Sequence, residues 1–146
     1  MYEASAQSAL AVYEAFLRGR CTALAVSVCS HELNDTARGA VDKSMAALGY
    51  GSGACAHIAI EAQGMSIGAS DVHNMIEAID PLALILCDDS AVQIVSHAYR
   101  RPIEADADGR VLGRSVAAFR DLESMMGTPE GKQRAWALFK KLPHLE

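Results

Sequence analysis

Side chains that can do acid–base or nucleophilic chemistry follow the predicted strands of this chain, where each strand gives way to a helix. The carboxyl ends of parallel strands meet at one edge of a sheet, so these side chains should gather there. They are Cys29, Ser30, His31, Glu32, Asn34 and Asp35 after the first predicted strand, Glu61 and Gln63 after the second, Cys87, Asp88, Asp89 and Ser90 after the third, and Arg120 and Asp121 after the fourth.

His31 can act as a general base in this set, because a neighbouring carboxylate orients and tunes an imidazole. With Asp88 as its orienter or as a substrate ligand, and Arg120 as an anion anchor, the set would suit a small hydrolase or lyase. Further ligand contacts are then expected from Glu32, Asn34, Asp89 and Ser90. The alternative is that these are ordinary loop and cap residues, because polar turns join strands to helices in any α/β protein.

The cysteines of this set suggest two further chemistries. Cys29, His31 and Cys87 are suitable zinc ligands if the first and third strands are neighbours, but a fourth ligand is missing and the spacing matches no zinc motif. Cys29 and Cys87 also precede predicted helices, where a thiolate is favoured. Cysteines at strand ends are, however, usually packing residues. We therefore expect no metal and no cofactor.

The strands and helices that must position these side chains alternate along the sequence. Apolar runs predict strands at 22–28, 54–60, 82–86 and 111–119, and apolar residues spaced by three and four predict helices at 4–18, 35–48, 70–79, 90–99, 121–126 and 129–142. This alternation predicts one α/β domain over 1–146, a three-layer sandwich with a short, mainly parallel four-stranded sheet and helices on both faces. The polar segment 100–110 is expected to be its most mobile loop.

The charge balance excludes some classes of function. The chain carries 18 acidic and 13 basic residues and a net charge of −5, whereas a general binder of phosphate backbones needs clustered Lys and Arg. The arginines late in the chain leave single-strand nucleic-acid binding as a third hypothesis. No apolar run approaches the roughly 20 residues of a membrane span, and the N-terminus lacks the basic segment of a signal peptide. We expect a cytosolic protein.

The stretch 79–91 combines a helix that ends at a proline, a buried strand and a turn into the next helix. It reads Ile79-Asp80-Pro81-Leu82-Ala83-Leu84-Ile85-Leu86-Cys87-Asp88-Asp89-Ser90-Ala91, and Val111-Leu112-Gly113-Arg114 with 116–119 follows as a later strand. Together these segments resemble the uracil-DNA glycosylase superfamily over residues 79–120. The resemblance implies a four-stranded parallel sheet between helices.

The catalytic motifs of that family are absent from the matching positions. Residues 29–35 lack the glycine and proline of the family's water-positioning motif, and residues 119–122 lack the histidine of its base-contacting loop. The resemblance therefore implies a shared fold without the shared activity.

Two functions compete on these grounds. The first is a non-catalytic binding or assembly module with the glycosylase-like fold, whose partner is a second copy of the chain or another protein bound through the last predicted helix, which carries Trp136. The alternative is the small hydrolase or lyase, acting on a nucleoside-like or small polar substrate at the carboxyl edge of the sheet.

Overall fold

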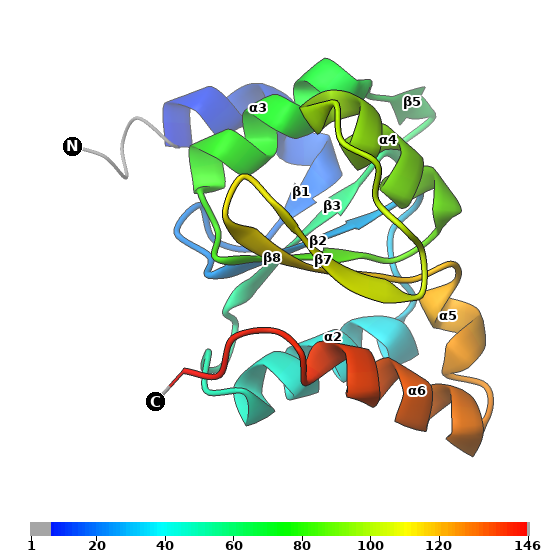
Figure 1. The fold of residues 1–146 in the computed structure, drawn as a ribbon. Coiled ribbons are helices and arrows are strands. Elements are labelled where there is room, and N and C mark those ends of the chain that lie inside the picture. The colour runs from blue at the N-terminus through cyan, green and yellow to red at the C-terminus, as the bar shows by residue number, and fades with distance from the viewer. Residues whose placement is uncertain (1–6, 146) are drawn as a thin grey trace.

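The computed structural model describes residues 7–145, which form a mixed α/β fold around a six-stranded, mainly parallel sheet (Figure 1). The strands of this sheet are β1 (Leu17–Arg18), β2 (Ala25–Cys29), β3 (Cys55–Ala59), β6 (Ala83–Leu86), β7 (Ala107–Val111) and β8 (Arg114–Ala118). Their order is β1-β3-β2-β6-β8-β7, with the four inner strands parallel and both edge strands antiparallel to their neighbours. A separate hairpin pairs β4 (Glu61–Ala62) with β5 (Met65–Ser66).

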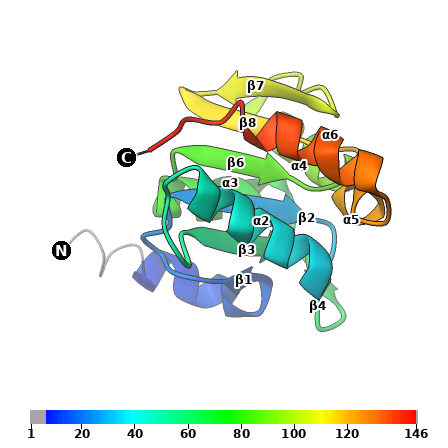
Figure 2. The same cartoon turned by 90° about the horizontal axis from the view of Figure 1, so that it is seen from below.

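Helices lie on both faces of this sheet (Figures 1 and 2). One face is covered by α3 (Ala69–Ile79) and α4 (Asp89–Tyr99), together with the short 3-10 helix η1 (Ala11–Phe16). The other face is covered by α2 (Asp35–Ala47), α5 (Leu122–Met125) and α6 (Pro129–Phe139). Within the described chain, each helix is too short or too polar to reach across a bilayer.

The inner strands are almost entirely apolar because helices cover both faces of the sheet. In β2, Val26 and Val28 pack into the core beneath α3 and α4, whereas Ala25 and Cys29 pack into the core beneath α2 and α6. Successive side chains of a strand point to opposite faces, so a strand with no exposed face needs an apolar residue at nearly every position. The predicted α/β class and mainly parallel sheet are thus confirmed, but the sheet has six strands and not the four predicted, because an antiparallel strand is added at each edge.

Polar residues after the strands cap the helices that follow. A side-chain oxygen accepts a hydrogen bond from the backbone N–H three residues later, which satisfies one free donor of the first helical turn. The pairs are Asn34 with Ala37 at 2.8 Å, Asp88 with Ala91 at 2.9 Å and Asp121 with Ser124 at 3.1 Å. Capping is therefore one task of the polar set at the carboxyl edge.

The structure differs from the predicted elements at both edges of the sheet. Of the helix predicted over 4–18, residues 7–10 are α-helical, η1 continues it as a 3-10 helix, and residues 17–18 form β1 instead; residues 4–6 lie outside the described chain. The strand predicted over 111–119 is a hairpin of β7 and β8, which turns at Leu112 and Gly113 with φ of 48° and 84°. Part of the predicted loop 100–110 belongs to β7, so that prediction was wrong there. The edge strands are short or polar, and hydrophobic periodicity gives no signal for them.

Candidate functional site

Three chain segments meet at the carboxyl edge of β2 and β6. These strands pair in parallel with Val28 opposite Leu86, so the residues that follow them lie side by side. The N–H of Leu122 donates to the carbonyl of Cys87 at 2.9 Å, which fixes the start of α5 against the end of β6. The site is therefore built from the ends of two central strands and the first turn of a short helix.

The Asp88 carboxylate lies at the centre of this site. Its Oδ1 caps α4, and its Oδ2 accepts from the Ser30 hydroxyl at 2.5 Å, the Ser30 N–H at 3.1 Å and the Cys29 thiol at 3.4 Å. Burial raises the pKa of Asp88, but the bonds from Ser30, Ala91 and Cys29 favour the ionised form and leave the pKa below its ordinary value. Asp88 is thus a fixed anion beside Ser30.

The imidazole of His31 joins Ser30 to a second carboxylate. Its Nδ1 lies 2.9 Å from Ser30 Oγ, and its Nε2 lies 2.5 Å from Glu123 Oε1. Glu123 also accepts the N–H of Asn34 at 2.8 Å, so its carboxylate is held at both oxygens. About half of the His31 side chain, 52%, is exposed to solvent. A continuous chain of hydrogen bonds therefore runs from Asp88 through Ser30 and His31 to Glu123.

The protons of this chain can be arranged in two ways. A carboxylate only accepts, so Nε2 of His31 carries the proton that bonds Glu123. Ser30 has one hydroxyl hydrogen and two acceptors in reach, Asp88 Oδ2 and His31 Nδ1. When that hydrogen points to Asp88, a protonated Nδ1 can donate to Ser30 Oγ. Both the neutral and the cationic form of His31 are therefore hydrogen-bonded, as an acid–base residue requires.

The two cysteines of the edge differ in their contacts. Burial, with further contributions from Asp88 and Glu123, raises the pKa of Cys29 to about 12, so it is a thiol at neutral pH. Cys87 is fully buried, with its sulfur 3.8 Å from the carbonyl of Ile85. Burial raises the pKa of Cys87 well above its ordinary value. Neither residue is an activated nucleophile in this environment.

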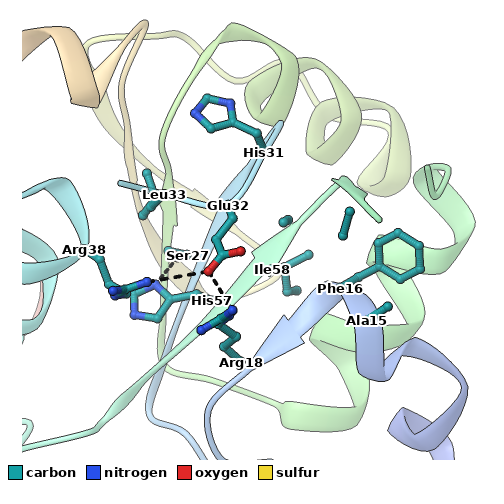
Figure 3. A pocket seen from close by; sticks show the side chains of 12 residues that line it. Ala15, Phe16, Arg18, Ser27, His31, Glu32, Leu33, Arg38, His57 and Ile58 are labelled. Carbon is teal, nitrogen blue, oxygen red and sulfur yellow. Dashed lines mark hydrogen bonds and ion pairs between the residues drawn. The ribbon is translucent and has the colours of Figure 1, made fainter. Parts of the chain in front are cut away.

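A narrow pocket of about 30 Å³ lies to one side of His31 (Figure 3). The Glu32 carboxylate lies at this pocket between two guanidinium groups, 2.8 Å from Arg18 and 3.8 Å from Arg38. Figure 3 shows the ring of His31 turned away from these three side chains. A pocket of this volume holds only a few water molecules, so it has no room for a substrate.

A larger and more open hollow of about 440 Å³ lies on another side of His31, against the β4–β5 hairpin. Its polar lining comes from Glu61, Gln63 and Ser66, and Ala62, Gly64 and Met65 complete it. This volume falls in the range of small-molecule sites. The exposed imidazole of His31 therefore borders a space that a small polar molecule can enter.

A second serine–histidine pair lies inside the sheet. Ser27 of β2 is fully buried, and its Oγ lies 2.6 Å from Nδ1 of His57 on β3. The Nε2 of His57 lies 3.3 Å from Asp42 of α2. Burial lowers the pKa of His57 more than Asp42 raises it, so the ring is neutral at pH 7. Because Nε2 then holds the hydrogen that faces Asp42, Nδ1 accepts from the Ser27 hydroxyl.

The residues predicted for one site are divided by the structure. His31 and Asp88 are joined through Ser30, and Asn34 reaches the same network only through its backbone N–H. Arg120 is exposed and lines a different hollow, of about 500 Å³, beside Arg134. The other predicted ligand residues lie outside the hydrogen-bonded network: Glu32 pairs with arginines, and Asp89 and Ser90 form the exposed start of α4.

The prediction from the sequence missed Glu123 and Ser27. Glu123 lies 92 positions from its partner His31, and its acidic side chain in a helical first turn looks like an ordinary dipole or cap residue. His57 lies within the strand predicted over 54–60, and the structure has it there as a neutral, paired histidine of β3. The one signal for Ser27 is a polar residue in an otherwise apolar strand.

The arrangement at the carboxyl edge has the parts of an acid–base site: an exposed imidazole, a carboxylate that fixes its tautomer, a hydroxyl that can pass a proton, and an adjoining hollow. Its carboxylates and thiol are also donors that a metal ion could use. No protein-family model matches this chain, and no curated protein matches it.

Proposed function

We propose that the protein is a small hydrolase or lyase that acts on a nucleoside-like or other small polar substrate at the carboxyl edge of the sheet. The observation that carries this proposal is the chain of hydrogen bonds from Asp88 through Ser30 and His31 to Glu123. It passes through the half-exposed imidazole of His31, which borders the hollow beside the β4–β5 hairpin.

His31 is the general base in this proposal, and Glu123 is its positioning residue. The Glu123 carboxylate holds the hydrogen on Nε2, so Nδ1 is the nitrogen that receives a proton. A water molecule or substrate hydroxyl beside Ser30 gives its proton to Ser30 Oγ as Ser30 passes its own hydrogen to Nδ1. The imidazolium so formed is stabilised by Glu123 and, across Ser30, by the Asp88 anion.

Ser30 serves as a proton relay rather than as a nucleophile. Its Oγ lies 2.5 Å from Asp88 Oδ2, which is ionised at neutral pH because its pKa lies below the ordinary value. An alkoxide on Ser30 would face that anion at hydrogen-bond distance, and two like charges so close are strongly disfavoured. The attacking oxygen therefore comes from water or from the substrate.

The test is a screen of the purified protein against small esters, phosphate esters, amides and nucleosides, with His31→Gln as the diagnostic variant. Loss of a positioned general base lowers a rate by roughly 10²–10⁴-fold. His97→Gln, on the exposed face of α4, is the matched control and should keep the wild-type rate. An activity that His31→Gln leaves unchanged would overturn the proposal.

The second candidate function is a binding or assembly module, and one observation favours it. A hollow of about 420 Å³ lies between α2 and α6, and the side of it formed by α6 carries Trp136, which is 37% exposed. Large aromatic residues at the surface are enriched at protein interfaces. The partner to test first is a second copy of the chain, by light scattering over a range of concentrations. Trp136→Ala should then abolish association and Val12→Ala, at an exposed site on η1, should not.

We further propose that the helices and the four inner strands form a three-layer sandwich related to the uracil-DNA glycosylase superfamily. The parallel arrangement of β3, β2, β6 and β8 supports this relationship. A cytosolic location belongs to the same proposal and is supported by four cysteines that are free thiols. Nucleic acid is not the expected partner.

A further inference from the structure

We propose that Cys29, His31 and Asp88 bind a divalent ion of the zinc class. Among the described residues they are the one group of three potential ligands, with Sγ, a ring nitrogen and a carboxylate oxygen all within 4.8 Å of one another. The sequence alone suggested Cys87 as the third ligand; the structure places Asp88 there and directs Cys87 to the carbonyl of Ile85.

The distances suit a tetrahedral ion. Cys29 Sγ lies 3.4 Å from Asp88 Oδ2 and 4.0 Å from His31 Nδ1. Zinc–sulfur bonds of about 2.3 Å and zinc–nitrogen or zinc–oxygen bonds of about 2.0–2.1 Å separate tetrahedral ligand atoms by about 3.3–3.6 Å. The two separations from Cys29 Sγ are thus within a few tenths of an ångström of those in a tetrahedral site, and the third lies within 4.8 Å.

The outer contacts of these residues are those of a metal site. The ring nitrogen of His31 that faces away from the cluster bonds Glu123 Oε1 at 2.5 Å, and metal-bound histidines nearly always donate that hydrogen to a carboxylate or carbonyl. Asp88 is held by the N–H groups of Ala91 and Ser30. Two of the three ligands are thus oriented before an ion arrives.

The ligand types select the ion. A thiolate, an imidazole and a carboxylate together favour zinc or cobalt over calcium or magnesium, which prefer oxygen ligands. Binding transfers the thiol hydrogen of Cys29 to solvent and replaces its bond to Asp88 with a bond to the ion. Three protein ligands leave a fourth position for water or Ser30 Oγ, as in catalytic zinc sites.

The ion changes the role of His31 if the proposed function also holds. As a ligand through Nδ1, His31 would orient the ion and could not also take a proton there, so its role as general base would belong to the metal-free protein. A bound ion would instead supply a water molecule of lowered pKa. This last step rests on the proposed function, whereas the binding of the ion does not.

The test is a titration of the purified full chain with Co²⁺, followed by Zn²⁺ competition. We expect one Co²⁺ per chain, intense visible bands of a tetrahedral site, and a near-ultraviolet thiolate-to-cobalt band, all abolished by Zn²⁺. Cys29→Ser should remove the near-ultraviolet band, and Cys21→Ser, at a half-buried thiol outside the site, should keep it. A thiolate band that survives in Cys29→Ser, or a titration with no thiolate band in the wild type, overturns the proposal.

Two further variants keep the test independent of any folding defect in Cys29→Ser. His31→Gln replaces a half-exposed side chain, and Glu123→Gln changes only the outer contact; each should weaken Co²⁺ binding by roughly 10–100-fold. Wild-type affinity in His31→Gln counts against the site. Cobalt binding without any hydrolase activity would refute the proposed function alone. A wild-type titration with no thiolate band, beside an activity that His31→Gln abolishes, would refute the metal site alone.

Discussion

Two chains of hydrogen bonds in this protein join a serine, a histidine and a carboxylate, and they lie in very different surroundings. Ser27, His57 and Asp42 connect the middle of β2 and β3 to α2, and the His57 side chain is 14% exposed. Ser30, His31 and Glu123 connect the end of β2 to α5, and the His31 side chain is 52% exposed. The same residue types are thus present inside the sheet and at its carboxyl edge.

The difference lies in how many partners compete for each proton. The Ser27 hydroxyl bonds His57, and burial keeps that ring neutral, so the serine hydrogen lies between these two side chains. Ser30 faces His31 and the Asp88 anion together, so its hydrogen has two arrangements. A serine–histidine–carboxylate chain therefore stabilises the fold where its protons are fixed, and supports chemistry where they can move and solvent can reach them.

Replacing each histidine in turn is expected to distinguish the two hydrogen-bond networks most strongly. His31→Gln should lower any hydrolase activity by roughly 10²–10⁴-fold while leaving the unfolding midpoint close to wild type, because its side chain is half-exposed. His57→Gln should do the reverse: the activity stays, and the free energy of unfolding falls. Steady-state rates and urea unfolding of both variants measure this. If both variants lost activity, or both lost only stability, the two hydrogen-bond networks would not have the different roles assigned to them.

Replacing each carboxylate tests which one positions a working histidine. Glu123→Gln removes the acceptor that holds the His31 tautomer, and loss of such an outer partner lowers activity or metal affinity by roughly 10–100-fold. Asp42→Asn alters the equivalent contact of His57, at 3.3 Å, and should leave the rate unchanged. Equal loss of rate in both variants would show a general structural effect instead.

Replacing each serine compares how much the two hydrogen-bond networks contribute to the free energy of unfolding. Ser27→Ala leaves the buried Nδ1 of His57 without its donor and should cost about 1–3 kcal/mol of unfolding free energy. Ser30→Ala, at a half-buried position, leaves Asp88 Oδ2 with its bonds from the Ser30 N–H and the Cys29 thiol, so it should cost less than Ser27→Ala. Urea unfolding at neutral pH gives both values. A larger cost for Ser30→Ala would contradict the division of roles.

The smallest effect expected is on the pH dependence of stability. The pKa of His57 is lowered in the folded protein, so the unfolded chain binds its proton more readily. The His57 contribution to stability is therefore complete above the unfolded pKa of about 6.5 and is lost as the pH falls toward the folded value. His57→Gln should flatten the unfolding free energy below about pH 6.5. A variant profile parallel to wild type would rule out this role.

Local sequence signals predicted most of the fold. The predicted helices over 35–48, 70–79 and 90–99 match α2, α3 and α4 within about one residue at each end, because caps and apolar periodicity act over a few residues. The strand predicted over 82–86 matches β6 for the same reason. The edge strands were missed because their pairing depends on the neighbouring strand and not on their own composition.

The candidate site could be predicted only in outline. The sequence predicted that His31 and Asp88 would lie at the same edge of the sheet, and they meet there through Ser30. It could not indicate that Glu123, and not Asp88, would bond the imidazole directly. It also could not show that Arg120 would line a separate hollow together with Arg134.

The amino-acid sequence by itself determined the alternation of buried strands and amphipathic helices, the helix starts and the edge at which polar groups collect. These features follow from interactions between residues close in the chain. Only the tertiary structure decided which groups touch: Ser30 and Asp88 are 58 positions apart, and His31 and Glu123 are 92 apart. Such contacts depend on strand register and on where α5 begins against β6, and a shift of one residue in either would separate the partners.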